Sequence, residues 1–126
     1  MSEYGAAVLE HFRNPRGAGR LPEGDPETLH GEAVDADGGQ RIRLHLRIGA
    51  QGRIECARFQ AFGCPIAIAA GSAAVARLEG ASVAEALALR ADELAQELAL
   101  TPEQARLAEL PLAALREALA YLRPRS

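Results

Sequence analysis

Apolar and polar side chains alternate without a break over residues 41–48. The even-numbered positions are aliphatic (Ile42, Leu44, Leu46 and Ile48), whereas the odd-numbered positions carry only Arg or His. Alternate side chains of a strand lie on opposite faces, so the segment predicts a half-buried strand with His45 on its solvated face. The turn at 49–52 then predicts a hairpin in which residues 53–62 return beside this strand. A weaker pattern predicts another strand at residues 30–36.

Helical signals flank the predicted strands on both sides. Residues 2–13 have a small apolar face and a candidate cap at Ser2. Residues 66–78 are rich in alanine and predominantly apolar, which predicts a helix buried on several sides. The Glu79-Gly80 pair is expected to end this helix.

Shorter helices are expected after residue 80. Ser82 and Thr101 are suitable caps for two of them, and residues 91–98 form another. Because proline interrupts a helix interior, we expect a break at Pro111 and a last helix over residues 111–122.

The order of these elements predicts the fold class. A helix, then a strand meander, then several helices indicates an α+β protein. We therefore predict a three-stranded antiparallel sheet with the helices packed mainly on one face. A chain of 126 residues is long enough for one core, so we expect a single domain over residues 1–126.

The charge balance restricts the classes of partner. The chain has 14 basic and 17 acidic residues, a net charge of −3. Nucleic-acid-binding domains carry a basic surplus, so no nucleic-acid partner is expected. No apolar run reaches the roughly 18 residues of a membrane span, and the first residues lack the pattern of a signal peptide. The sequence therefore predicts a cytoplasmic protein without a membrane partner.

One cysteine stands where its chemistry can change. Gly63 supplies the backbone freedom of a sharp turn and Pro65 suits the first helical position, so Cys64 is expected to be an N-cap. The helix dipole and the unpaired N–H groups there favour the thiolate, which attacks sulfur or binds metal. A lone cysteine is more often a small buried apolar residue, and this alternative stays open. Cys56 forms no CxxC pair or zinc motif with Cys64.

Other side chains suited to metal binding are dispersed. Asp35 and Asp37 can offer carboxylates from a turn, although turn aspartates are usually structural. His11, His30 and His45 lie far apart in the sequence, and we expect His11 to be a surface or packing residue. None of the three forms a metal-binding spacing by itself. From the residues alone, the sequence predicts an α+β domain with one candidate reactive cysteine.

Two motifs extend this interpretation. Residues 8–16 read VLEHFRNPR, and residues 54–69 read IECARFQAFGCPIAIA. Together with the order of the later helices, they resemble the U-type iron–sulfur cluster scaffold family of IscU, SufU and the N-terminal domain of NifU. The first is similar to the family's H-[FY]-x-N-P-R pattern and the second to its I-x-D-A-x-F-x-x-x-G-C-x-x-[AS]-x-A pattern. The resemblance covers nearly the full length and implies the family's α+β fold.

The resemblance also implies a ligand set, from which this chain departs. The family holds a nascent 2Fe–2S cluster, or zinc, with three cysteines and an assisting Asp or His. Cys64 matches the second cysteine. Gly38 stands where the first cysteine belongs and Gln40 where a carboxylate belongs. Arg106 and Leu107 stand where the family has His followed by Cys.

Cys64 is therefore the metal-binding residue that the resemblance implies for an iron–sulfur cluster, iron or zinc. Cluster ligation takes four ligands, usually thiolates, so one thiolate does not hold a cluster within one chain. Asp35, Asp37 or His30 are candidate substitutes for the missing ligands. Two chains could instead each offer Cys64 to a bridging cluster.

Two functional readings follow from the resemblance. The first is a divergent assembly scaffold that takes persulfide from a cysteine desulfurase, or metal, on Cys64. The second is an adaptor that docks a desulfurase or another assembly partner without binding a cluster. A space around Cys64 filled by apolar side chains such as Leu107 would favour the adaptor. Neither reading describes an enzyme.

The family's chaperone-recognition segment is also reduced in this chain. It retains only Leu100 and Pro102. The resemblance therefore does not carry an Hsp70-type chaperone contact over to this protein.

Overall fold

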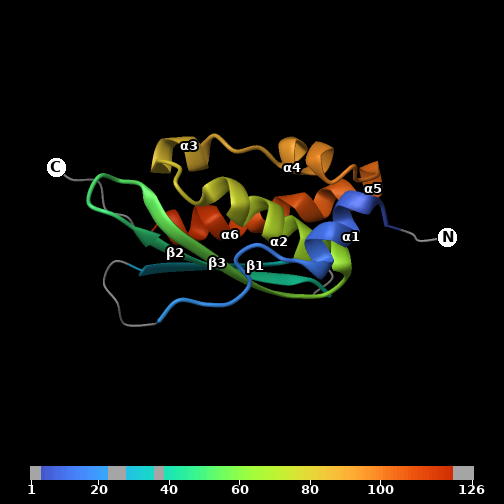
Figure 1. Cartoon of the computed structure of the whole chain (residues 1–126), viewed down its shortest axis with the longest axis horizontal. Helices are drawn as coiled ribbons and strands as arrows, with labels where there is room; N and C mark the ends of the chain where they lie inside the picture. Colours follow the sequence, from blue (N-terminus) through green and yellow to red (C-terminus); the bar gives the residue numbers. More distant parts are fainter. Residues whose placement is uncertain (1–3, 23–27, 36–38, 121–126) are drawn as a thin grey trace.

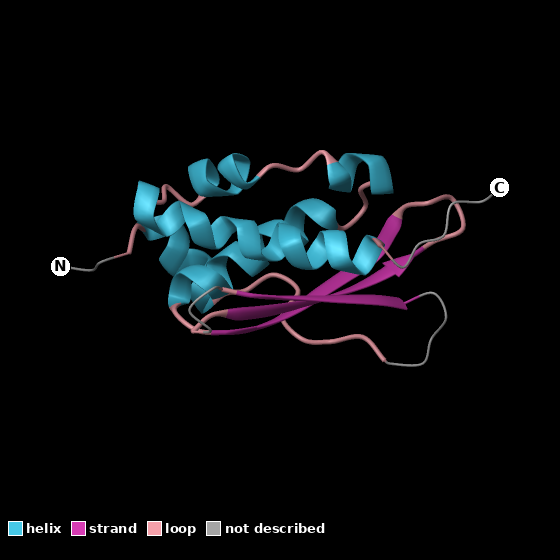
Figure 2. Ribbon diagram, turned by 180° about the vertical axis from the view of Figure 1, so that it is seen from behind, coloured by secondary structure: helices cyan, strands magenta, loops and turns pink. Residues whose placement is uncertain are grey.

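The elements of the computed structural model, which describes residues 4–22, 28–35 and 39–120, form two layers (Figure 1). One layer is a three-stranded antiparallel sheet in the order β1-β2-β3, made of β1 (Thr28–Val34), β2 (Arg41–Ile48) and β3 (Ile54–Phe62). The helices form the other layer, on one side of the sheet, as the view from behind also shows (Figure 2). The predicted α+β class and meander are confirmed, with the first strand two residues earlier than expected.

The inner face of the sheet carries the aliphatic residues that the alternating pattern predicts. Ile42, Leu44 and Leu46 are fully buried, and Ile48 is half-buried. Two long helices cover this face: α2 (Pro65–Leu78) contacts β3, and α6 (Glu109–Leu119) contacts β1 and β2. Alternation along one strand thus determines which face receives the helices.

The outer face is not uniformly solvated, and the prediction of a solvated His45 is wrong. The side chain of His45 is 1% exposed. Its Nε2 lies 3.0 Å from Oε1 of Gln60, and its ring meets that of His30 edge-on with 4.7 Å between centroids. Because β2 is the central strand, His30 and Arg58 lie directly opposite His45 on its two sides. Cross-strand neighbours therefore flank the imidazole on both sides.

The first helix is shorter than the sequence predicts. α1 spans Ala6–Arg13, and its N-cap is Gly5, which has extended backbone angles. The expected cap Ser2 lies outside the described residues. Glycine has a low helix propensity, which is consistent with a start after Gly5.

The connector after α1 packs against the sheet. Gly17 accepts a hydrogen bond from the backbone N–H of Phe59 at 2.8 Å, and Gly19 donates one to the carbonyl of Phe59 at 2.9 Å. These bonds satisfy backbone groups on the outer edge of β3, which blunts an otherwise open edge.

The short helices after α2 follow their predicted start signals. Ser82 and Thr101 each cap a helix through a complete capping box. In the first box, the backbone N–H of Ser82 bonds to Glu85 and holds the pKa of that carboxyl below its ordinary value of 4.5. The elements are α3 (Val83–Leu87), α4 (Ala91–Glu97), α5 (Pro102–Ala105) and the 3-10 turn η1 (Arg106–Ala108).

The predicted helix break at Pro111 is wrong. α6 begins at Glu109, so Pro111 lies in its first turn. The first N–H groups of a helix have no partner within it, and a proline there removes no hydrogen bond. The irregularity falls earlier, at η1. Leu112, Leu115 and Leu119 of this helix are buried, whereas the expected C-terminal end at residue 122 lies outside the described residues.

Residues 4–22, 28–35 and 39–120 contain no helix with the length and hydropathy that crossing a bilayer requires.

Candidate functional site

Cys64 lies at the turn from β3 to α2, as the sequence predicts. Gly63 has a φ of +133°, and Cys64 is the N-cap of α2 with Pro65 as the first helical residue. The side chain of Cys64 is half-buried, makes no capping hydrogen bond and forms no disulfide. The predicted position of the thiol is confirmed. The reactivity that we infer from this position stays a prediction.

Gln40 contacts the backbone of Cys64. Its side-chain Oε1 accepts a hydrogen bond from the N–H of Cys64 at 2.8 Å. A Cβ atom on Gly63 would collide with this amide oxygen, so the close approach also depends on glycine. The residue at the family's carboxylate position therefore binds the start of α2 as a neutral acceptor.

Asp35 and Arg106 form an ion pair beside this contact. The Nη1 of Arg106 donates to Oδ1 of Asp35 at 2.6 Å. The Asp35 side chain is 14% exposed and that of Arg106 is 56% exposed. The backbone N–H of Asp35 also donates to the carbonyl of Gln40 at 2.8 Å, which links the ion pair to the Gln40 contact.

Leu107 follows the ion-paired arginine and belongs to the core. Its side chain is 5% exposed, and η1, in which it lies, contacts α2. An aliphatic side chain therefore occupies the position where the resemblance places a cysteine. The helper Asp37 and the degenerate position Gly38 lie outside the described residues.

His30, the other substitute ligand that the sequence suggested, lies elsewhere. It pairs with His45 in the middle of the sheet. Gln40, just before β2, and Cys64, just after β3, instead contact each other at one end of the sheet. Its Nε2 is buried without a hydrogen-bond partner. Cys56 lies within β3, opposite Arg47. The structure therefore brings neither His30 nor Cys56 to the Cys64 site.

Among the residues that the structure describes, the donors around Cys64 do not fit a metal ion or a cluster within one chain. In the part of the chain that the structure describes, no group of three or more His, Cys, Asp or Glu side chains could hold a metal. Zinc and iron–sulfur clusters take four ligands, predominantly thiolates and imidazoles. Here the Gln40 amide contacts Cys64, and the Asp35 carboxylate, which Gln40 links to this contact through its backbone, already has a cationic partner in Arg106.

The sequence did not reveal a buried polar network at His11. The Nδ1 of His11 lies 2.7 Å from Oγ of Ser72, and its Nε2 lies 3.2 Å from Oε2 of Glu97. The Ser72 hydroxyl oxygen also accepts a hydrogen bond from the backbone N–H of Arg16 at 2.8 Å. Glu, His and Ser stand in the order of a hydrolase triad. Ser72 is 0% exposed, so its hydroxyl cannot meet a substrate, and the network instead joins α1, α2 and α4.

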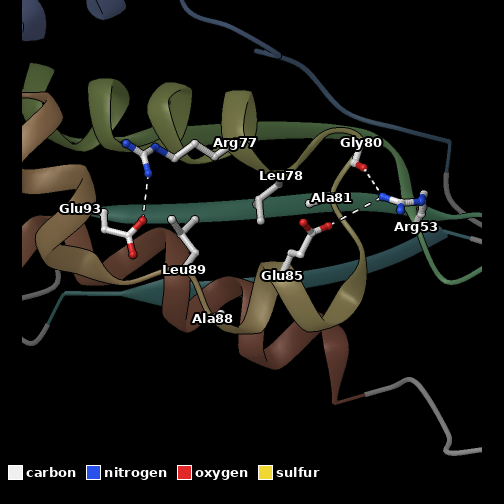
Figure 3. Close-up of a pocket in the computed structure, with 9 residues that line it drawn as sticks. All are labelled: Arg53, Arg77, Leu78, Gly80, Ala81, Glu85, Ala88, Leu89 and Glu93. Carbon is white, nitrogen blue, oxygen red and sulfur yellow. Dashed lines mark hydrogen bonds and ion pairs between the residues drawn. The ribbon is translucent and has the colours of Figure 1, made fainter.

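A hollow of about 530 Å³ lies away from Cys64, at the C-terminal end of α2 (Figure 3). The charged side chains that line this hollow form ion pairs or hydrogen bonds with neighbouring residues. Arg77 donates to Glu93 at 3.0 Å, and Arg53 donates to the carbonyl of Gly80 at 3.0 Å and lies 3.7 Å from Glu85. None of the residues proposed at the Cys64 site lines this hollow.

Comparison with family models supplies the deciding observation. The model described as NifU-like N terminal domain matches residues 3–126. The chain belongs to this family. The match covers the β3–α2 turn with Cys64, the segment from Asp35 to Gln40 and the Arg106–Leu107 pair.

Several proteins of similar sequence are named as iron–sulfur cluster assembly proteins. This NifU-like domain is 34% identical over 120 residues to the mitochondrial iron sulfur cluster assembly protein 1 of Schizosaccharomyces pombe, covering 95% of this chain and 62% of that protein. It is 36% identical over 99 residues to the scaffold protein IscU of Azotobacter vinelandii, covering 79% and 77%. It is 32% identical over 117 residues to IscU of Escherichia coli K12, covering 93% and 91%.

Solved structures confirm the fold. A SUF-system iron–sulfur scaffold from Fervidobacterium islandicum aligns with a TM-score of 0.74 and 16% identity, covering 92% of this chain and 96% of that one. The N-terminal part of a NifU-like protein from Brucella abortus aligns with a TM-score of 0.73 and 17% identity, covering 92% and 91%.

Proposed function

We propose that this NifU-like domain works in iron–sulfur cluster assembly as a scaffold-like protein, with Cys64 receiving sulfur or metal. The observation that carries the proposal is the family match over residues 3–126. The names of the relatives in Schizosaccharomyces pombe, Azotobacter vinelandii and Escherichia coli support it. No comparison supports the adaptor alternative. The cytoplasmic location stays a prediction.

The chemistry at Cys64 is a sulfur transfer between thiols. The Cys64 thiolate attacks the outer sulfur of a persulfide on a cysteine desulfurase, and the desulfurase cysteine leaves as a thiolate. Cys64 then carries the persulfide, with one S–S bond broken and one formed. Attack requires access, and the Cys64 side chain is half-buried at a helix start rather than sealed in the core.

Scaffold proteins in general accept cargo and hand it on rather than turn it over, so we assign no catalytic residue. The partners that we propose are iron–sulfur assembly proteins, with a cysteine desulfurase as the sulfur donor. An iron–sulfur cluster, iron or zinc would be cargo rather than a resident cofactor.

A sulfur-loading experiment tests this function. The chain is incubated anaerobically with a purified cysteine desulfurase, cysteine and Fe²⁺, and then measured by intact-protein mass, visible absorption and iron content. We expect one added sulfur atom in wild-type protein and in the control Cys56→Ser, and none in Cys64→Ser. Equal loading of Cys64→Ser, or no loading of wild-type protein, would contradict the proposal.

A further inference from the structure

Two of the degenerate ligand positions, Gln40 and Arg106, carry side chains that hydrogen-bond to other residues near the start of α2 and the end of β1. The contacts join the end of β1 and the neighbouring start of β2 to two segments that are distant in the sequence, the β3–α2 turn and the start of η1. Arg106 binds Asp35 across 71 residues of sequence, and Gln40 binds Cys64 across 24. The Asp35–Gln40 backbone bond joins the two contacts. We call these three hydrogen-bonded contacts the latch.

The latch satisfies the groups that a metal ion would otherwise engage. The carboxylate of Asp35 is mostly buried and receives a charge-assisted bond from a guanidinium. An arginine does not lose its proton in proteins and cannot serve as a metal ligand. The Gln40 amide oxygen is directed to the N–H of Cys64. A cation that binds the Asp35 carboxylate would therefore have to displace Arg106 from its ion pair.

We infer that two of the family's ligand positions, Gln40 and Arg106, form a metal-free latch with Asp35 and the backbone of Cys64, so that one chain alone does not hold a metal ion or a cluster at Cys64. The side chains of Asp35, Gln40 and Arg106 join the segments around Cys64 that a bound metal ion would otherwise join. Metal cargo at Cys64 then requires ligands from another chain, whereas sulfur carried on the thiol does not. This inference rests on the proposed function only for the identity of the cargo.

A zinc titration of the full chain tests the inference. Reduced protein is titrated anaerobically with Zn²⁺ against a chelator, and its mass in solution is measured by light scattering. We expect wild-type monomer to bind no Zn²⁺ at about micromolar concentration, where structural sites are saturated. Half an equivalent of Zn²⁺ per chain, bound only by a dimer, would agree with ligands from a second chain. One Zn²⁺ per monomer, lost in Cys64→Ser, would overturn the inference.

A ligand-restoring variant gives the converse result. Arg106→His combined with Leu107→Cys releases Asp35 and adds an imidazole and a thiolate, which suits tetrahedral zinc. We expect this double variant to bind about one Zn²⁺ per chain, and to lose it when Cys64→Ser is added. Equal zinc binding by the wild-type chain and this variant would count against the latch.

Thermal unfolding tests the latch without any metal. Arg106→Ala leaves the mostly buried Asp35 carboxylate without its guanidinium, and we expect the Tm to fall by about 3–8 °C. The matched control is Arg116→Ala, because Arg116 lies 3.7 Å from Glu109 and both side chains are well exposed. Its Tm should change by about 2 °C or less. Equal shifts in the two variants would refute the latch, whereas failed sulfur loading would refute only the proposed function.

Discussion

At the residue scale, Ser72 shows how one hydroxyl connects distant parts of the chain. Ser72 is fully buried within the apolar helix α2, and its hydroxyl oxygen accepts a hydrogen bond from the backbone N–H of Arg16. Its oxygen also lies 2.7 Å from Nδ1 of His11, and Nε2 of His11 lies 3.2 Å from Oε2 of Glu97. The Ser72 hydroxyl and both ring nitrogens of His11 therefore have polar partners, as buried polar groups require.

Replacing Ser72 by Ala should destabilise the protein by about 1–3 kcal/mol, because the partly buried Arg16 N–H and the buried His11 Nδ1 then lose the Ser72 hydroxyl as a partner. The measurement is the free energy of unfolding in urea. Ala76→Ser provides the control, since it introduces the same hydroxyl at an exposed position of the same helix. The control should change stability by about 0.5 kcal/mol or less. A neutral Ser72→Ala would show that the network contributes nothing to folding.

At the element scale, β1 and α6 approach closely because position 31 has no side chain. A Cβ atom on Gly31 would collide with the carbonyl oxygen of Ala114 and lie 2.5 Å from the backbone nitrogen of Ala118. Both contacts are with the helix backbone, which cannot move aside by a rotamer change. No local sequence pattern indicates that this glycine determines how α6 packs on the sheet.

We expect Gly31→Ala to destabilise the protein by about 1–3 kcal/mol or more, because α6 must shift away from β1. Gly39→Ala is the matched control, because a Cβ atom there meets no neighbour within 4 Å. Unfolding in urea measures both variants. An equal, small effect at the two positions would mean that α6 can adjust freely over the sheet.

At the scale of the whole molecule, one core joins both layers. The buried cluster includes Val8 of α1, Leu44 of β2, Val75 of α2, Leu94 of α4 and Leu115 of α6. The latch and the His11 network add polar connections between the same elements. An arrangement of this kind leaves no element with a separate core of its own among the described residues.

The prediction of a single domain therefore becomes a prediction about unfolding. Calorimetry should show one transition whose calorimetric and van't Hoff enthalpies agree, at about 80–90 kcal/mol near 60 °C for a chain of this length. Two resolved transitions would indicate that the chain contains separately folding parts.

The sequence by itself determined the local elements. Alternation defined β2, the turn chemistry defined the hairpin, and Gly63, Cys64 and Pro65 defined the start of α2. Ser82 and Thr101 cap the helices that follow them, as their side-chain oxygens predict. These features depend on residues a few positions apart, so periodicity and capping are sufficient to find them.

The tertiary structure alone decided how distant residues meet. His45 is buried because neighbouring strands bring His30 and Arg58 beside it, and Pro111 is tolerated because α6 starts two residues earlier than the expected break. The Arg106–Asp35 pair spans 71 residues and the His11–Ser72 contact spans 61. Such contacts depend on the packing of helices on the sheet, so no local pattern encodes them. The resemblance located the degenerate positions, and the fold showed that Gln40 binds the backbone of Cys64 and that Arg106 binds Asp35.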